Sequence, residues 1–330
     1  MPFSNNQVGP SMAQTRPSAP ICSKLWQRQA WPTWALIVLV YSSWIVLMSH
    51  ASQLSWWLVS PMAAVLLCLH GSVQHELLHG RPSPWRWLND SLGWMPLSLW
   101  IPYFQYRNHH QLHHEIHTIT EPGLDPESYY HWPHDWYLKS AMVRLLWQLN
   151  YTFIGRMLIG PWLVVGLFIK SETQFFWRGF SQPSSLATVL HQINWVLHLL
   201  LVAGVVMWLD VQGIVWWQYI VLCVWPGLSL TLMRSYAEHR PGDNNHRRCV
   251  IIEGSWVTRL LFMNVNIHQV HHEFPHLPWF MVYGHWRRYK QSILVSNGGY
   301  FYQNYWSLMK QTMVHPKDSP MYQKKPANRS

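Results

Sequence analysis

Histidines gather in three clusters whose spacing suits metal binding. The first cluster is His75-Glu-Leu-Leu-His79, the second is His110-Gln-Leu-His-His, and the third is His268-Gln-Val-His-His. Residues three and four positions apart lie on one face of a helix, so each cluster can direct two or three imidazoles to a common point. Neutral imidazole is a good ligand for iron, zinc, copper and nickel ions. The spacing therefore predicts metal chemistry.

The clusters hold too many histidines for one metal ion. A metal centre takes about four to six ligands, and one further histidine, in Tyr-Ala-Glu-His-Arg, follows the last long apolar segment. Two ions would share such a set. The predicted metal ligands are His75, His79, His110, His113, His114, His239, His268, His271 and His272.

Residues beside the clusters are candidates for the outer shell of the site. Ligand histidines need hydrogen-bond acceptors that fix the tautomer of the ring. For each acidic candidate, ordinary solvation of a polar surface is at least as good an explanation. The candidates are Glu76, Glu115, Glu238, Glu273 and Asp125, together with His109, which adjoins the second cluster out of register.

Two other metal sites fit part of the pattern. The first cluster also reads H-E-x-x-H, the zinc protease motif, with Glu76 as general base. That interpretation leaves both H-x-x-H-H clusters without a role. A carboxylate-bridged di-iron site needs paired E-x-x-H motifs, which Glu76–His79 and Glu273–His276 match formally, but Pro275 interrupts the second.

The composition indicates a membrane protein. Only 12% of the 330 residues are charged, where a soluble domain averages about a quarter. Apolar residues make up 49%, including 24 tryptophans, which excludes a disordered chain. The net charge of +10 comes from basic residues that flank apolar segments, so a membrane surface is favoured over nucleic acid as the partner.

The apolar segments predict four membrane spans in two hairpins. Residues 29–75 contain no charged side chain; one helix of that length would be about 70 Å long, more than twice the ~30 Å hydrocarbon core. Two shorter stretches, 91–106 and 157–169, are expected to be interfacial or re-entrant helices. The predicted spans are 31–48, 54–70, 185–209 and 214–233.

The distribution of basic residues predicts how the protein is oriented in the membrane. The turns at 50–53 and 210–213 contain no lysine or arginine, so most basic residues fall on the side of the termini and the histidine clusters. The positive-inside rule makes that side cytoplasmic. The sequence predicts an all-α integral membrane fold: a cytosolic tail (1–30), a membrane domain (31–295) whose cytosolic helical cap carries a di-metal site, and a basic C-terminal tail (296–330).

The three clusters, in this order and with four spans, resemble the membrane fatty acid desaturase family. The wider superfamily includes carotenoid ketolases and hydroxylases and alkane hydroxylases. The resemblance runs over residues 51–289. Two local segments, Arg234-Ser-Tyr-Ala-Glu-His239-Arg and His271-His-Glu-Phe-Pro-His-Leu-Pro-Trp279, resemble bacterial acyl-lipid desaturases.

The resemblance implies an activity and its cofactors. The nine histidines would bind two non-haem iron ions, and O2 and electrons would be used to remove two hydrogens from an acyl chain of a membrane lipid. The metal centre does the chemistry, so no separate acid or base is assigned. Asn264, four residues before His268, would lie near the metal.

The sequence also bears on the electron donor and on rival functions. It contains no C-x-x-C-H motif and no ferredoxin-type cysteine run, so a separate ferredoxin- or cytochrome-like donor is expected. Two other functions stay open. One is a hydroxylase or ketolase acting on a carotenoid or an alkane, and the other is a membrane zinc protease using the first cluster.

Overall fold

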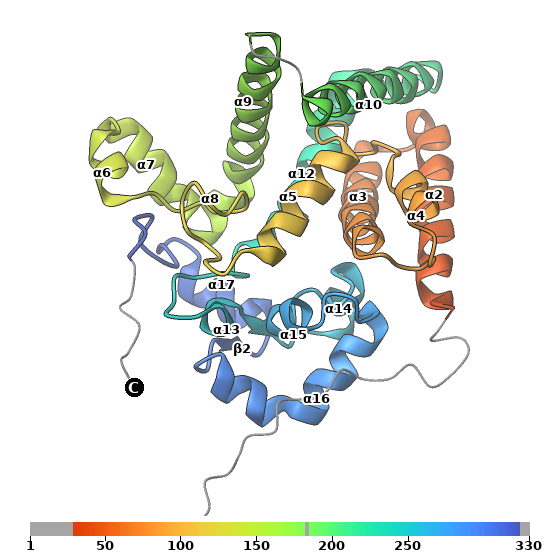
Figure 1. Cartoon of the computed structure of the whole chain (residues 1–330). Helices are drawn as coiled ribbons and strands as arrows, with labels where there is room; N and C mark the ends of the chain where they lie inside the picture. Colours follow the sequence, from red (N-terminus) through yellow and green to blue (C-terminus); the bar gives the residue numbers. More distant parts are fainter. Residues whose placement is uncertain (1–28, 182–184, 324–330) are drawn as a thin grey trace, which may run out of the picture.

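The computed structural model describes residues 29–181 and 185–323, so nearly all of the predicted N-terminal tail lies outside the described residues. The fold is mostly helical (Figure 1). In chain order the elements are α2 (Trp31–His50), η1 (Ala51–Gln53), α3 (Trp56–Leu78), α4 (Arg86–Gly93), α5 (Tyr103–Glu115), α6 (Pro133–Leu138), α7 (Ala141–Asn150), α8 (Phe153–Leu158), α9 (Gly160–Ser181), α10 (Leu186–Val211), α11 (Trp216–Tyr219), η2 (Ile220–Val224), α12 (Trp225–Ser235), α13 (Asn245–Arg248), β1 (Ile251–Ile252), α14 (Trp256–Leu261), α15 (His268–Glu273), α16 (Trp279–Ser296), β2 (Phe301–Tyr302) and α17 (Tyr305–Thr312).

The first predicted hairpin is formed by α2 and α3. Both helices are long and apolar enough to cross a membrane, and the 3₁₀ turn η1 joins them. Ser55 caps α3, because its side chain accepts a hydrogen bond from the backbone N–H of Trp57. The helix α3 continues to Leu78, eight residues beyond the predicted end of the span. This extension places His75 in the last turn of the helix.

The second predicted hairpin differs from the expectation. The helix α10 is a third candidate span, but the segment 214–233 is divided into α11, the π-helical turn η2 and α12. Pro226, at the start of α12, has no N–H to donate to the preceding turn. The π-helical turn η2 lies directly before α12. Within residues 29–181 and 185–323, three helices therefore qualify as spans by length and composition, not the predicted four.

The two short apolar stretches do not form separate interfacial helices. The first, 91–106, contains the end of α4 and the start of α5, with a non-helical connection that ends at Pro102. The second, 157–169, belongs mostly to α9, which continues through Lys170 and Glu172 to Ser181. These charged residues end the apolar stretch in the sequence, but they do not end the helix.

The cap, which we define as residues 245–323, is folded through its last described residues. It is not purely helical, since β1 and β2 form a small parallel sheet in which Ile251 pairs with Phe301. The helix α17 packs through Tyr305 and Leu308 into a buried cluster with Phe262. The predicted C-terminal tail thus contributes a strand and a helix to the cap.

Two connections hold the cap against the ends of α3 and α12. The hydroxyl of Ser72 in α3 donates to the carbonyl of Leu261, 2.9 Å away. After α12 the chain forms an antiparallel bridge between His239 and Cys249. Within the cap, the backbone N–H of Gln269 in α15 donates to the carbonyl of Val250, next to this bridge. The ends of α3, α5, α12 and α15 consequently meet in the interior of the molecule.

Candidate metal centre

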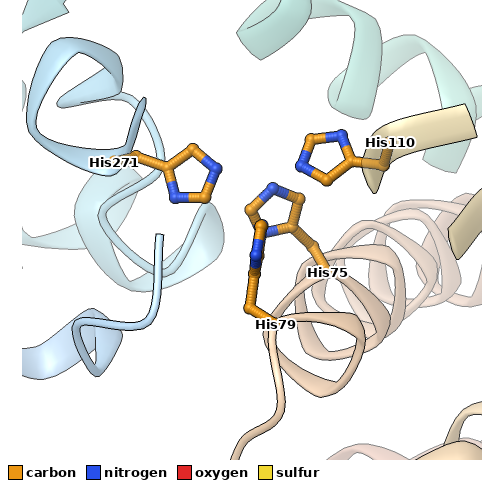
Figure 2. Close-up of side chains that lie close together, drawn as sticks. All are labelled: His75, His79, His110 and His271. Atoms are coloured by element: carbon orange, nitrogen blue, oxygen red, sulfur yellow. The ribbon is translucent and has the colours of Figure 1, made fainter. Parts of the chain in front are cut away.

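The fold brings all nine predicted histidines into one region. Eight of them form two groups, and within each group the possible ligand nitrogens lie within 4.8 Å of one another. Figure 2 shows the rings of the first group converging from three separate segments. The first group is His75, His79, His110 and His271, and the second is His113, His239, His268 and His272.

The ninth histidine joins the first group. The Nε2 atom of His114 lies 3.0 Å from Nε2 of His110 and 3.0 Å from Nε2 of His271. Its ring is also stacked on that of His272, with centroids 4.2 Å apart. His114 therefore lies between the groups, and its nitrogen contacts are with the first group. The nine histidines thus form one set of five and one set of four.

The second group is equally compact. The Nε2 atom of His239 is 3.0 Å from Nε2 of His113 and 2.9 Å from Nε2 of His268. The Nε2 atom of His272 is 3.0 Å from that of His268. Each ring comes from the end of a helix or from the bridge after α12, so backbone structure fixes its position.

These distances fit metal coordination. A metal–nitrogen bond of about 2.1 Å separates neighbouring ligand nitrogens by roughly 3.0 Å at right angles and ~3.4 Å in a tetrahedron. The Nε2 atoms of His75 and His79 are buried and have no hydrogen-bond partner among the described residues. A buried polar atom without a partner is costly, so a metal ion would satisfy atoms that nothing else satisfies.

Hydrogen bonds orient three of the rings with Nε2 facing inward. The Nδ1 atom of His110 is 2.7 Å from Oε1 of Glu127, and that of His113 is 2.9 Å from Oδ1 of Asp125. The Nδ1 atom of His268 is 3.2 Å from the carbonyl oxygen of Val265. Carboxylates and carbonyls only accept, so Nδ1 carries the proton and Nε2 keeps its lone pair for a metal.

Burial keeps most of the rings neutral. It lowers the pKa of His271 and His272 well below the ordinary value, and nearby histidines lower it further. Burial also disfavours the charged form of His113, but the carboxylates of Glu127 and Asp125 outweigh it and raise that pKa to about 9, so a metal ion binding there would displace the proton on Nε2. Neutral imidazole is the form that binds metal.

The outer-shell candidates fall into two classes, and four of them lie close to the site. Asp125 contacts His113, as described, and Glu238 Oε1 is 3.5 Å from Nδ1 of His268 while pairing with Arg234. Both Asn264 and Glu76 bind the backbone of Trp279. The Oδ1 atom of Asn264 is buried and has no hydrogen-bond partner in the part of the chain that the structure describes.

The other three candidates do not contact the clustered rings through the bonds described. Glu115 is exposed, and Glu273 is half-buried at the end of α15. His109 faces away, with Nε2 3.8 Å from Oε1 of Glu172 in α9. Its position next to His110 in the sequence turns it to another face of α5.

Glu127 is a residue that the sequence interpretation missed. It lies two residues after Asp125 in the loop that follows α5, and both carboxylates reach back to histidines of that helix. The signal was present as Asp-Pro-Glu, the carboxylate pair that follows the second cluster. What the sequence lacked was the loop path that returns to α5.

A cavity of about 600 Å³ adjoins the metal centre. Its lining includes His75, His110, His239 and His268. Apolar side chains from α3, α9, η2 and α12 line another part, which includes Leu67, Val164, Leu167, Phe168, Val224 and Leu228. The clustered histidines are thus accessible to an apolar molecule of moderate size.

Comparison with known protein families agrees with this geometry. The family model described as fatty acid desaturase matches residues 51–304, more than half of the chain and a segment that contains all nine histidines. Comparison with curated proteins gives no match, and comparison with solved structures gives none.

Proposed function

The chain belongs to the fatty acid desaturase family of O2-dependent oxidoreductases, and from this premise we propose that it introduces a double bond into the acyl chain of a membrane lipid. The cavity carries the proposal, because apolar side chains and clustered histidines line the same space. An acyl chain has no polar group along its length, so only apolar walls can hold it in place.

The apolar part of the cavity would position the chain beside the histidines. Gly71 lies one helical turn before His75 in α3 and lines the cavity. A Cβ atom added at Gly71 would meet nothing within 4 Å. Since residues four apart share a helix face, the space next to Gly71 adjoins the metal centre on the membrane side.

We assign the nine histidines as ligands of two non-haem iron ions. With O2 and two electrons, these ions would supply the oxidising power that removes two hydrogens from neighbouring carbons. The protein's own contribution is to hold the rings through Asp125, Glu127 and the carbonyl of Val265, and to enclose the reacting carbons in apolar side chains. Asn264, with its unpartnered Oδ1, would hydrogen-bond a water near the irons.

The membrane arrangement extends the proposal. The protein is a membrane protein with three candidate spans. We assign the helical segment 216–235 as a fourth crossing, which places both termini and the metal site on the cytoplasmic side. Electrons would then come from a separate ferredoxin- or cytochrome-like donor. The described cysteines Cys68, Cys223 and Cys249 are buried and free.

Filling the space at Gly71 is expected to reduce activity on long chains. The substitution Gly71→Leu places four carbon atoms in the cavity, and overpacking of this kind costs about 1–3 kcal/mol. The turnover of the longest accepted acyl chain should fall about 5- to 160-fold, and shorter chains should be affected less. Product analysis over a series of chain lengths measures this.

The matched control is Gly204→Leu. Gly204 is also helical and also has open space at its Cβ position, but it is exposed on α10 and does not line the cavity. Equal losses from both substitutions, or no dependence on chain length for Gly71→Leu, would argue against this position for the acyl chain.

The effect of substituting Glu76 distinguishes a desaturase from a zinc protease. In a zinc protease Glu76 would be the general base, and Glu76→Gln would lower turnover about 10²- to 10⁴-fold. In our account its carboxylate accepts from the N–H of Trp279 at 3.3 Å, which a glutamine oxygen can also do. We expect Glu76→Gln to keep desaturation within about tenfold of wild type. Assays of both activities on the same preparation decide between them.

The function is tested by expression in a host with simple lipids and a working electron donor. Mass spectrometry with double-bond mapping should find a new unsaturated acyl chain that is absent with His114→Ala. An oxygenated lipid or carotenoid in its place would indicate the hydroxylase or ketolase alternative. An unchanged lipid profile, the same with and without His114, would contradict acyl desaturation.

A further inference from the structure

Arg156 is a buried cation that lacks an anion. Its exposed fraction is only 3%. Among the residues that the structure describes, no carboxylate forms an ion pair with it, and its Nε atom is buried without a hydrogen-bond partner. Its guanidinium lies over the ring of Tyr129, 4.0 Å from the centroid. This cation–π contact stabilises the charge without neutralising it.

The nearby charges are already engaged. The carboxylate of Glu238 is within electrostatic range of Arg156, but it pairs with Arg234 at 3.1 Å. Lys317 donates to the carbonyl of His239 at 2.6 Å and pairs with Asp318 at 2.8 Å. The carboxylates of Glu238 and Asp318 are thus paired with other cations, so the charge of Arg156 remains available to a ligand.

Arg156 lines the cavity that holds the clustered histidines. Asn150 lines the same cavity. Tyr129, beneath the guanidinium, follows Glu127, whose carboxylate contacts His110. The unpaired cation thus belongs to the space that we assign to the substrate and lies on the loop side of the metal centre.

A desolvated charge of this kind needs a counter-ion. Moving an unpaired ion out of water costs several kcal/mol, and the guanidinium fork matches the two oxygens of a carboxylate or phosphate. The apolar side chains of α3 and α9 exclude water from another part of the same cavity. A ligand that fills the whole cavity would therefore have an apolar chain and an anionic end.

We propose that Arg156 binds the anionic head group of the acyl substrate, a carboxylate or a phosphate. This inference rests on the proposed function for the identity of the substrate but not for the binding event. It narrows the substrate class to acyl compounds with a negatively charged end and sets neutral esters apart as poor ligands.

Equilibrium binding to the metal-loaded protein in a nonionic detergent tests the proposal. Three probes share one acyl chain: stearate, stearoyl lysophosphatidate and methyl stearate, used at alkaline pH so that the first is ionised. Wild type should bind at least one anionic probe about 10- to 100-fold more tightly than the ester. The better of the two anionic probes identifies the head group.

Substitutions assign the preference to Arg156. Arg156→Met should remove the preference for the anion while leaving the affinity for methyl stearate unchanged, which also reports an intact cavity. Arg156→Lys should keep part of the preference, and Arg287→Met, at an exposed position on α16, should keep all of it. Equal binding of acid and ester by wild type, or an unchanged preference in Arg156→Met, would overturn the proposal.

The outcome is independent of catalysis. Anion binding that depends on Arg156, without any double bond formed, would refute the proposed function and leave this inference standing. Desaturation without a preference for anionic probes would refute this inference and leave the proposed function standing.

Discussion

Replacing His268 with alanine is expected to abolish desaturation and to remove metal from the four-histidine group. Its Nε2 atom lies 2.9 Å from that of His239 and 3.0 Å from that of His272, so it is a central member of the group. Loss of an outer-shell partner alone costs about 10- to 100-fold in metal affinity or activity. Loss of the ring itself should therefore lower turnover at least ~100-fold.

The measurement is metal content together with product formation on the same purified protein. His134→Ala serves as the control, because His134 is exposed and contacts only the exposed Asp135 among the described ion pairs. Metal content and turnover should be unchanged by this control. A His268→Ala protein that keeps its full metal content and activity would remove this group from the site.

Asp125→Asn is expected to weaken metal binding about 10- to 100-fold. The carboxylate of Asp125 is buried and accepts from three groups: Nδ1 of His113 at 2.9 Å, the backbone N–H of Thr120 at 2.7 Å and that of Glu127 at 2.9 Å. An amide has one oxygen to replace two, so at least one buried donor loses its acceptor at a cost of about 1–3 kcal/mol. The loop and the ring should both become less well held.

Metal affinity in a chelator competition experiment tests this prediction. Asp135→Asn is a matched control, since Asp135 forms an equivalent contact with His134 at 3.2 Å, but on the surface. Surface ion pairs contribute about 0–1 kcal/mol, so this substitution should leave the affinity unchanged. Equal affinities for wild type and Asp125→Asn would show that the carboxylate does not position His113.

Short-range patterns predicted the histidines because helix geometry alone brings them together. His110 and His114 share a face of α5, and His268 and His272 share a face of α15. Which clusters combine is a property of the tertiary fold. The five-histidine set takes rings from three helix ends, and the sequence contains nothing that assigns His113 and His114, neighbours in the chain, to different groups.

Long-range contacts explain what the sequence did not reveal. Glu127 reaches His110 only because the loop after α5 turns back, and Arg156 is unusual only because it is buried while no carboxylate among the described residues forms an ion pair with it. The division of segment 214–233 reflects backbone hydrogen bonding around Pro226, which hydropathy does not register. The sheet between β1 and β2 joins two short pairs of residues about 50 positions apart, too short to give a strand pattern.

The most direct test of the two-metal site is elemental analysis of the purified wild-type protein by plasma mass spectrometry. The account predicts about two iron ions per chain, because nine imidazoles in sets of five and four exceed the ligand needs of one ion. A single zinc ion per chain, with iron absent, would contradict it.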